Sequence, residues 1–302
     1  MIRHTAALAG AAVLALTSLS TSVASATEVG TTAACTLNAG SVTAAGAQTY
    51  RTVTSTIPPT AGTQQTTANV FQAGAVRLSS TFTDIPNYVG SSRSGFVVIG
   101  DSLYIRGYTT DGSDQIDQTY PGGSTRIGGG WTPYRLIERS AYRPLDTDIP
   151  GRTHFYGLRN DGVLFRWNIT NGWKTAGSAA GFAAVKSMAL ISQNASYDTF
   201  LANTGSGALY TIRIPVTSPM KPVVKKVSTS GWSGRTLIAN RCGQYGTVLL
   251  AVNDAAKTGA LYAVGHANGL LTVIKALGNV PTSFGNPIQF RWGPESEYLN
   301  GE

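Results

Sequence analysis

One pattern recurs about every 50 residues along the chain and constrains its fold more than any other feature. Each copy starts with an aromatic residue, usually after glycine, and continues with an apolar segment and a hairpin that ends in leucine and an aromatic residue. The starting aromatics are 49, 51, 50 and 52 residues apart, and they are Phe82, Trp131, Phe182, Trp232 and Phe284. Self-similarity at a fixed period is typical of repeat proteins.

The hairpin of the repeat is clearest in residues 154–167. There an apolar run, the turn Asn160-Asp161-Gly162 and a second run that opens with Leu164 follow one another. Asn, Asp and Gly accept the positive φ angles of tight hairpin turns, so this order predicts two antiparallel strands. Copies occupy residues 199–210 and 248–262, and a weaker copy occupies residues 96–104.

Units of 40 to 50 residues with room for about four short strands are typical of β-propeller blades. The five aromatics therefore predict an all-β, five-bladed β-propeller of about 50 residues per blade. The last unit is incomplete: residues 284–292 give one strand and residues 297–300 a second. We expect the N-terminal segments 40–43, 49–56 and 75–80 to complete it, so that one blade shared by both chain ends closes the ring.

Residues 1–26 have the features of a secretory signal peptide. A basic start precedes an apolar run from Ala6 to Leu16, and the segment ends in Ala24-Ser25-Ala26. The apolar run is too short for a retained membrane span. We therefore expect a secreted protein whose residues 27–302 form the propeller domain, with no membrane span.

The two cysteines, Cys35 and Cys242, are an even pair, which in an exported protein predicts a disulfide. Cys35 precedes the strands that complete the last blade, and Cys242 lies in the blade before it. The bond would then secure the closure of the ring. The alternative is two free thiols.

The charge pattern disfavours a nucleic-acid partner. The formal net charge is +8, but the basic residues are scattered and form no stripe with interleaved aromatics. We expect no nucleic-acid partner, and we expect a monomer.

No pattern in the sequence predicts catalysis or a cofactor. There is no Gly-x-Ser-x-Gly motif and no histidine spacing of a metal site. His154 and His266 stand at strand ends in different blades. Asp111, Asp114 and Asp117 could offer oxygens to calcium, but they lack the glycine and terminal glutamate of a calcium loop, and a polar hairpin loop explains them equally well. We expect no enzyme, no cofactor and no metal.

The recurring aromatics and turn residues are the candidate ligand contacts. An aromatic at the start of each unit can pack between blades, or it can offer its face to a sugar ring beside polar turn residues. Trp131, Trp173 and Trp232 are the best candidates for the second role. Asn160, Asp161 and Asn253 are either turn residues or hydrogen-bonding partners of the ligand.

Two segments resemble the blade motif of the tachylectin-type five-bladed propeller lectins. They are Arg126-Ile127-Gly128-Gly129-Gly130-Trp131 with Tyr134 and Leu136, and the run from Tyr156 to Arg166. The resemblance implies pockets between neighbouring blades that bind N-acetylated amino sugars. Of the repeated positions, Gly130 with Trp131 and Gly231 with Trp232 match the family's Gly-Trp segment.

The sequence thus predicts a secreted, non-catalytic, lectin-like propeller that binds glycans through several weak sites. One alternative is a secreted scaffold for proteins or cell walls, in which every repeated aromatic belongs to the core. Another is a secreted hydrolase with its site in the central tunnel. Exposed tryptophans at blade edges would favour the first, an apolar rim patch the second and converging carboxylates the third.

Overall fold

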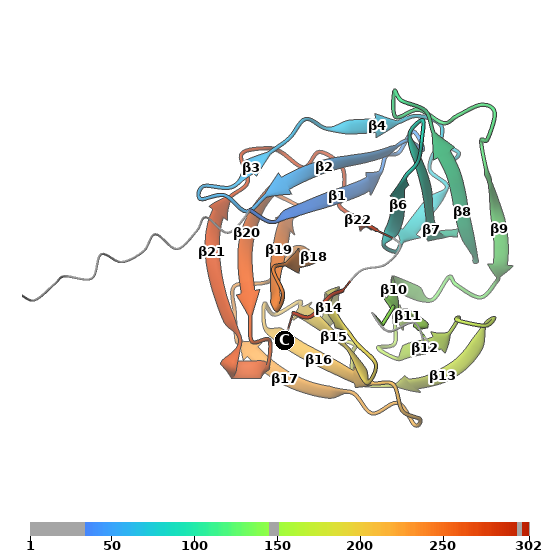
Figure 1. Ribbon diagram of the computed structural model, residues 1–302. Coiled ribbons are helices and arrows are strands. Elements are labelled where there is room, and N and C mark those ends of the chain that lie inside the picture. Colours follow the sequence, from blue (N-terminus) through green and yellow to red (C-terminus); the bar gives the residue numbers. More distant parts are fainter. Residues whose placement is uncertain (1–33, 145–150, 295–297, 302) are drawn as a thin grey trace, which may run out of the picture. The chain divides into compact units, whose positions relative to one another are not determined.

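The structure is a computed structural model that describes residues 34–144, 151–294 and 298–301. The predicted signal peptide, residues 1–26, lies outside the described residues. Residues 34–302 form one compact unit. In the described part of it we find 22 β-strands and a single 3-10 turn, η1 (Gly269–Leu271), so the all-β prediction is confirmed (Figure 1).

Three sheets have four antiparallel strands each, joined in sequence order. The first contains β10 (Tyr134–Tyr142), β11 (Arg152–Arg159), β12 (Leu164–Asn168) and β13 (Lys174–Ala179). The second contains β14 (Val185–Gln193), β15 (Tyr197–Thr204), β16 (Leu209–Pro215) and β17 (Val223–Ser228). The third contains β18 (Arg235–Cys242), β19 (Gly246–Asn253), β20 (Thr258–Gly265) and β21 (Val273–Asn279). Each sheet thus spans one copy of the sequence repeat.

The remaining strands form one ten-stranded sheet. Its N-terminal part contains β1 (Thr36–Val42), β2 (Gln48–Thr54), β3 (Thr60–Ala61) and β4 (Gln65–Thr67). The following part contains β5 (Val76–Ser79), β6 (Phe82–Pro86), β7 (Ser91–Ile99), β8 (Ser102–Thr110) and β9 (Gly123–Gly128). The tenth strand, β22 (Phe290–Gly293), lies between β1 and β6, antiparallel to the first and parallel to the second.

The N-terminal strands β1 and β2 share a sheet with the C-terminal strand β22, as the repeat predicts. Asn38 of β1 pairs with Trp292 of β22. The expected contribution of residues 75–80 to this unit is wrong, because they form β5, which pairs with β7. The expected second C-terminal strand at 297–300 is wrong as well. Asn300 instead forms a bridge with Ser192 in β14, and Leu299 is fully buried against the core of that region.

The expected disulfide is confirmed. The sulfur atoms of Cys35 and Cys242 are bonded, and their Cα atoms are 5.3 Å apart across a sequence separation of 207 residues. The bond joins the segment before β1 to the end of β18. It therefore links the N-terminal strands to the third four-stranded sheet.

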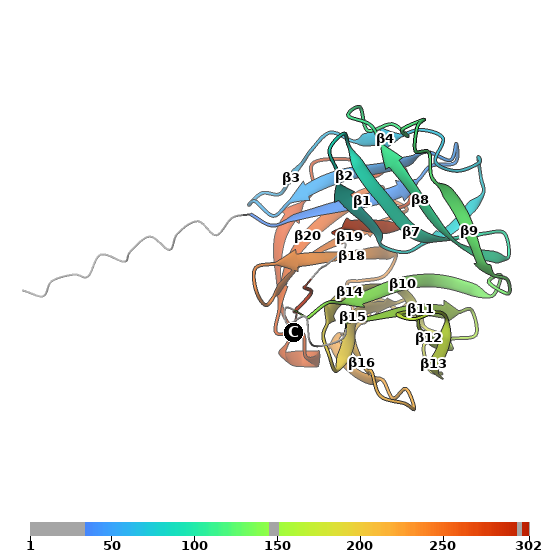
Figure 2. The same cartoon turned by 45° about the vertical axis from the view of Figure 1, so that its right-hand side comes forward.

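The sheets contact one another through their first strands and their faces. Strand β10 contacts β5 and β14, and β18 contacts β14, β1 and β22 (Figures 1 and 2). Apolar clusters fill the spaces between facing sheets. Leu158 and Leu164, for example, pack with Phe200 and Ile212 of the next sheet. The core therefore consists of several layers between sheets.

A recurring backbone hydrogen bond marks the true repeat positions. The N–H of an aromatic residue donates to a carbonyl oxygen in the preceding hairpin turn, with N···O distances of 2.9–3.1 Å. The pairs are Phe71 with Gly46, Trp131 with Asp101, Phe182 with Gly162, Trp232 with Gly207, and Phe284 with Lys257. Phe71, and not Phe82, is thus the first repeat position. Phe82 lies in β6, where its ring packs on Phe290 and Trp292.

The backbone conformation explains why glycine precedes three of these aromatics. Gly130, Gly181 and Gly231 have φ angles of 84°, 103° and 96°. This left-handed region disfavours residues with a Cβ. The Gly-aromatic pattern in the sequence therefore indicates a turn that leads into the next sheet.

Candidate functional site

Four of the five repeat aromatics are buried. Trp131, Phe182, Trp232 and Phe284 expose only 5–7% of their surface. Trp131 packs on Tyr134 and Trp167, with ring centroids 4.5 and 5.4 Å away. Trp232 packs on Tyr262 at 5.1 Å. In this structure these rings have the position of core residues between sheets.

Phe71 is the exception, because its side chain is only half-buried. It lines an open hollow of about 450 Å³ beside β7, β8 and β9, which we call the Phe71 hollow. Among the described residues no aromatic ring stacks on Phe71, whereas Tyr262 occupies that place for Trp232. The hollow is lined by Asn69, Val70, Phe71, Gln72, Ala75, Ile99, Tyr104, Arg106 and Ser124.

The Phe71 hollow combines apolar and hydrogen-bonding surfaces. Phe71 and Tyr104 contribute aromatic rings, and Gln72 and Ser124 contribute an exposed amide and an exposed hydroxyl. Asn69 has a φ of 56°, in the left-handed region that asparagine tolerates better than most residues. Such a surface can bind a ligand with both apolar and hydroxyl groups.

Arg106 forms the rigid wall of the hollow. Its guanidinium group donates to the carbonyl oxygens of Val70 (3.3 Å), Gly107 (2.9 Å) and Pro121 (3.3 Å). Burial lowers the pKa of Arg106. These bonds tie the segment that carries Phe71 to the loop before β9, so the hollow is held open by fixed backbone.

The sequence-predicted site residues fall into three separate places. Gly130, Trp131 and Trp173 lie in one region, where the half-buried Trp173 packs on Phe96 and Phe155 at 5.8 and 5.2 Å. Gly231 and Trp232 lie before β18, and Asn253 is the last residue of β19. No arrangement in the described residues joins all of these into one pocket.

The predicted polar contacts are engaged in their own turns. Asp161 accepts a hydrogen bond from the N–H of Val163 and pairs with Arg159 at 2.5 Å. The bond from Val163 is the main reason that the pKa of Asp161 is lowered. Asn253 accepts bonds from the N–H groups of Ala255 and Ala256. Asn160 is exposed, and its N–H donates to the carbonyl oxygen of Pro133 at 2.8 Å.

Sequence reasoning missed the Phe71 hollow. Phe71 follows valine rather than glycine, and it is 60 residues before Trp131. The interval is long because the connection between β8 and β9 covers residues 111–122. One signal could have identified the hollow. Phe71 follows the β1–β2 hairpin, just as each later repeat aromatic follows a hairpin.

A second concave feature lies between the first strands of the sheets. This cavity of about 170 Å³ is bordered by β5, β10, β14 and β18 and by the segment before β22. We call it the central cavity. Its charged lining residues are Arg77, Arg135, Lys186 and Glu138. Glu138 is thus the one carboxylate that the described residues contribute to it.

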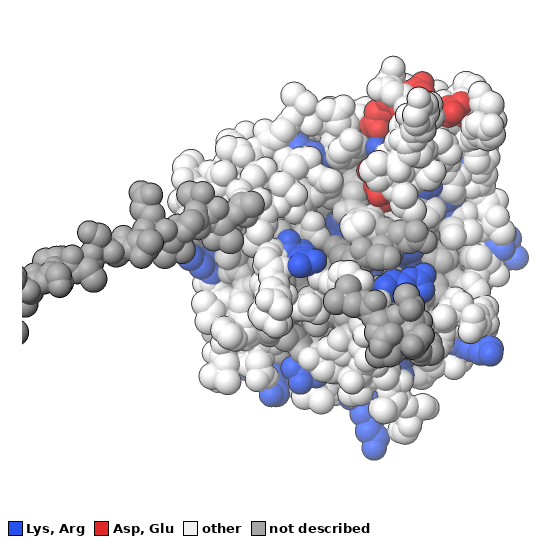
Figure 3. Space-filling model, in the orientation of Figure 1, with Lys and Arg blue, Asp and Glu red and all other residues white. Residues whose placement is uncertain are grey.

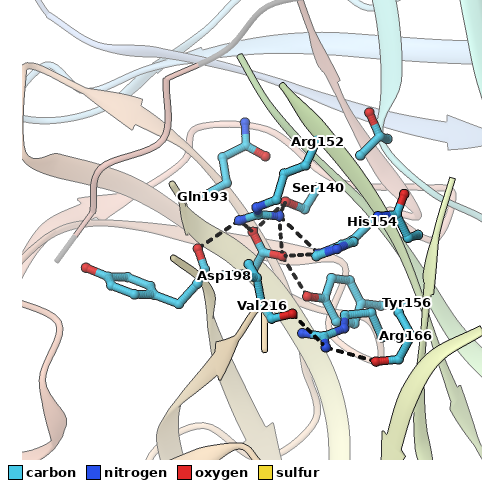
Figure 4. A network of polar contacts seen from close by, with 12 residues as sticks. Ser140, Arg152, His154, Tyr156, Arg166, Gln193, Asp198 and Val216 are labelled. Carbon is cyan, nitrogen blue, oxygen red and sulfur yellow. Dashed lines mark hydrogen bonds and ion pairs between the residues drawn. The ribbon is translucent and has the colours of Figure 1, made fainter. Parts of the chain in front are cut away.

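A buried polar network surrounds Asp198, which has no exposed surface (Figure 4). Its carboxylate accepts bonds from Ser140 Oγ (2.5 Å), Tyr156 Oη (2.6 Å) and two nitrogens of Arg152 (2.8 and 3.0 Å), and it lies 3.3 Å from His154 Nδ1. Burial alone would raise the pKa of Asp198, but the hydrogen bonds from His154, Arg152 and Ser140 hold it below its usual value. The network joins the sheets of β10–β13 and β14–β17.

The acidic residues Asp111 and Asp114 of the β8–β9 loop are engaged by hydrogen bonds within that loop and by an ion pair with β7. Figure 3 shows acidic side chains gathered over this loop, whereas lysines and arginines are scattered. Asp111 accepts from the N–H groups of Ser113 and Gln115, and Asp114 pairs with the buried Arg93 at 2.5 Å. Within the described ranges no three His, Cys, Asp or Glu side chains are placed to hold a metal ion.

Comparison of the sequence with known proteins gives no relative. No protein-family model matches the chain, and no curated protein matches it. In the described residues, no helix has the length and apolar character needed to cross a membrane.

Solved structures show remote likeness. The catalytic domain of a GH62 α-L-arabinofuranosidase from Coprinopsis cinerea is 10% identical, with 74% of this chain and 80% of that chain covered and a TM-score of 0.42. The α-L-arabinofuranosidase PaAbf62A from Podospora anserina, in complex with cellotriose, is 9% identical, with 74% of each chain covered and a TM-score of 0.41. A triple mutant of AofleA from Arthrobotrys oligospora is 12% identical, with 88% of this chain and 78% of that chain covered and a TM-score of 0.45.

These matches correct one expectation. The prediction that the protein is not an enzyme is contradicted, since two of the similar structures are arabinofuranosidases. We do not retain it. Matches at this level of similarity assign no activity to this chain.

Proposed function

We propose that the protein is a five-bladed β-propeller that is exported and binds carbohydrate. Five units support the fold: β10–β13, β14–β17, β18–β21, β5–β9, and β22 with β1–β4. The five equivalent aromatic-to-hairpin hydrogen bonds support the same count. The signal peptide expected at residues 1–26 and the Cys35–Cys242 disulfide support export.

We place the carbohydrate site in the Phe71 hollow. The observation that carries this proposal is that Phe71 alone among the five repeat aromatics of the described chain is not buried. A pyranose ring can lie on the rings of Phe71 and Tyr104 with its apolar face, while its hydroxyl groups point to Gln72 and Ser124. The fixed guanidinium of Arg106 closes one side.

The resemblance to tachylectin-type lectins supports N-acetylated amino sugars as the ligand class. An acetamido group carries one donor, one acceptor and a methyl group, and the hollow offers the side-chain amides of Asn69 and Gln72 beside an aromatic ring. Because the other four repeat aromatics are buried, this proposal has one such site per chain, not several equivalent sites.

A glycan array with the purified protein tests the proposal. Phe71→Ala keeps the backbone N–H that bonds to Gly46, so we expect it to fold and to bind amino sugars at least about tenfold more weakly. Tyr245→Ala is the matched control, because Tyr245 is an exposed tyrosine, 63% accessible, in another part of the chain. Unchanged binding by Phe71→Ala, or no binding by the parent protein, would refute the site.

A second candidate function rests on a separate observation. Leu270 and Leu271 of η1 are 83% and 72% exposed, and the exposed Val223 and Val224 lie on β17, the strand that contacts η1. An exposed apolar patch of this kind is typical of protein interaction surfaces. Under this scaffold hypothesis, Leu270→Glu with Leu271→Glu would abolish capture of a protein partner and leave glycan binding intact.

A further inference from the structure

We propose that the central cavity binds a small aromatic monocarboxylate of about the size of benzoate. This site is separate from the Phe71 hollow and does not depend on the proposed carbohydrate function. The charge of the cavity, the way its cationic groups are held and its size favour such a ligand.

The charged lining is positive. Arg77, Arg135 and Lys186 outnumber Glu138, which is the one carboxylate among the described lining residues. Glu138 is already engaged through Oε1, which accepts the N–H groups of Arg139 (2.7 Å) and Thr81 (3.1 Å). A ligand that enters the cavity therefore meets an excess of positive charge, which favours an anion.

The two guanidinium groups are fixed before any ligand arrives. Arg77 donates to the carbonyl oxygens of Trp131 and Tyr134, both at 2.5 Å. Arg135 donates to the carbonyl oxygens of Asn160 (3.1 Å) and Phe182 (2.9 Å) in the next turns. Carbonyl oxygens satisfy these donors without neutralising their charge, so the positive field is preorganised.

Two groups in the lining lack a partner among the described residues. The Nε atom of Arg135 is buried and makes no hydrogen bond there. Lys186 is exposed, and no described residue pairs with its ammonium group. A carboxylate at the mouth of the cavity would accept hydrogen bonds from these two groups. Hydrogen bonds between charged groups are stronger than those between neutral groups.

The rest of the lining is mostly apolar, so the part of the ligand that fills the cavity should be apolar. The apolar lining includes residues of four surrounding segments, among them Leu136, Ile137, Met188, Leu237 and Ile288. The volume is about 170 Å³. An apolar cavity of about 150 Å³ holds one benzene molecule, so one aromatic ring is the appropriate size.

Titration calorimetry with benzoate tests the inference, and benzyl alcohol serves as the uncharged ligand of the same shape. We expect saturable binding of benzoate, at least about tenfold tighter than that of benzyl alcohol. Lys186→Gln should weaken benzoate binding at least about tenfold. Lys174→Gln, on the exposed side of β13, is the matched control and should bind as the parent protein does.

A second variant tests the cavity independently of charge. Met188→Phe places a larger side chain in the lining and keeps all three cations, so it should abolish benzoate binding while the melting temperature shows that the protein folds. No saturation below about 10 mM benzoate would overturn the inference. Equal affinity for benzyl alcohol, or full binding by Lys186→Gln or by Met188→Phe, would overturn it as well. Glycan binding is measured on the same samples, so that failure of one site is distinguished from failure of the other.

Discussion

Asp198 of β15 and Arg152 of β11 form an ion pair between two sheets, with 2.8 Å between Oδ1 and Nη2. The Asp198 side chain is fully buried and also accepts bonds from Ser140 and Tyr156. Removing one member of a buried pair leaves the other charge without compensation. We therefore expect Asp198→Asn to lower the free energy of unfolding by about 3–5 kcal/mol, measured by urea denaturation.

An exposed ion pair provides the comparison. Asp161 and Arg159 are 2.5 Å apart, but their side chains are 46% and 37% exposed. Asp161→Asn should leave the free energy of unfolding nearly unchanged, because surface pairs contribute little and the amide oxygen can still accept from Val163. Equal effects of the two substitutions would contradict the special role of the Asp198 network.

The same network predicts the acid dependence of stability. Hydrogen bonds hold the pKa of Asp198 below its value in the unfolded chain, although burial opposes this. A carboxyl group with a depressed pKa stabilises the fold above its unfolded pKa of about 3.9, and the contribution is lost as the pH falls through the folded pKa. Below about pH 4, stability should therefore fall more steeply in the parent protein than in Asp198→Asn. Parallel curves in unfolding experiments from pH 7 to pH 2 would refute this assignment.

The hydrogen bonds that Asp101 accepts from the turn before β10 can be tested through the pKa of its carboxyl group. Its carboxylate accepts from the hydroxyl (2.6 Å) and N–H (2.8 Å) of Thr132 and from the N–H of Gly130 (2.9 Å). These bonds lower its pKa to about 2, the hydroxyl contributing most. Thr132→Val removes the hydroxyl, so NMR titration should show the pKa of Asp101 rising toward 3.8. Thr229→Val, at an exposed threonine elsewhere, should leave it unchanged.

The Cys35–Cys242 bond should contribute strongly to stability. It encloses a separation of 207 residues, and cross-linking so long a loop restricts the unfolded chain. The chain-entropy model gives an upper value of about 5 kcal/mol. Cys35→Ser with Cys242→Ser should lower the denaturation midpoint, and a reducing agent should lower that of the parent protein to the same level. If a reducing agent also lowers the denaturation midpoint of the double variant, its effect on the parent protein has a cause other than this disulfide.

Much of this fold could be predicted because hairpins leave local signals. The turn Asn160-Asp161-Gly162 connects β11 and β12 as expected, with Gly162 at a φ of 85°. The pairing of the chain ends followed from an incomplete last repeat. The parallel contact between β22 and β6 could not be predicted, since it depends on how Phe82 packs against Trp292 and not on either segment alone.

The candidate site was harder to predict for a related reason. A sequence pattern shows where an aromatic recurs, but its exposure depends on neighbours that are distant in the sequence. Trp232 and Phe71 occupy equivalent positions, and Trp232 is covered by Tyr262. The long β8–β9 connection also shifted the first interval, so Phe82 took the place of Phe71 in the prediction.

The difference between Trp131 and Phe71 can be measured as stability. Trp131 is 6% exposed and packs within a cluster that includes Phe155 and Tyr134. Trp131→Ala should therefore lower the free energy of unfolding by about 3–5 kcal/mol, as for other buried aromatics. Phe71→Ala removes a half-buried ring and should lower it by about 1–2 kcal/mol. Trp131→Ala with the stability of the parent protein would mean that its ring is not a core residue, and the Gly130-Trp131 segment would again be a ligand candidate.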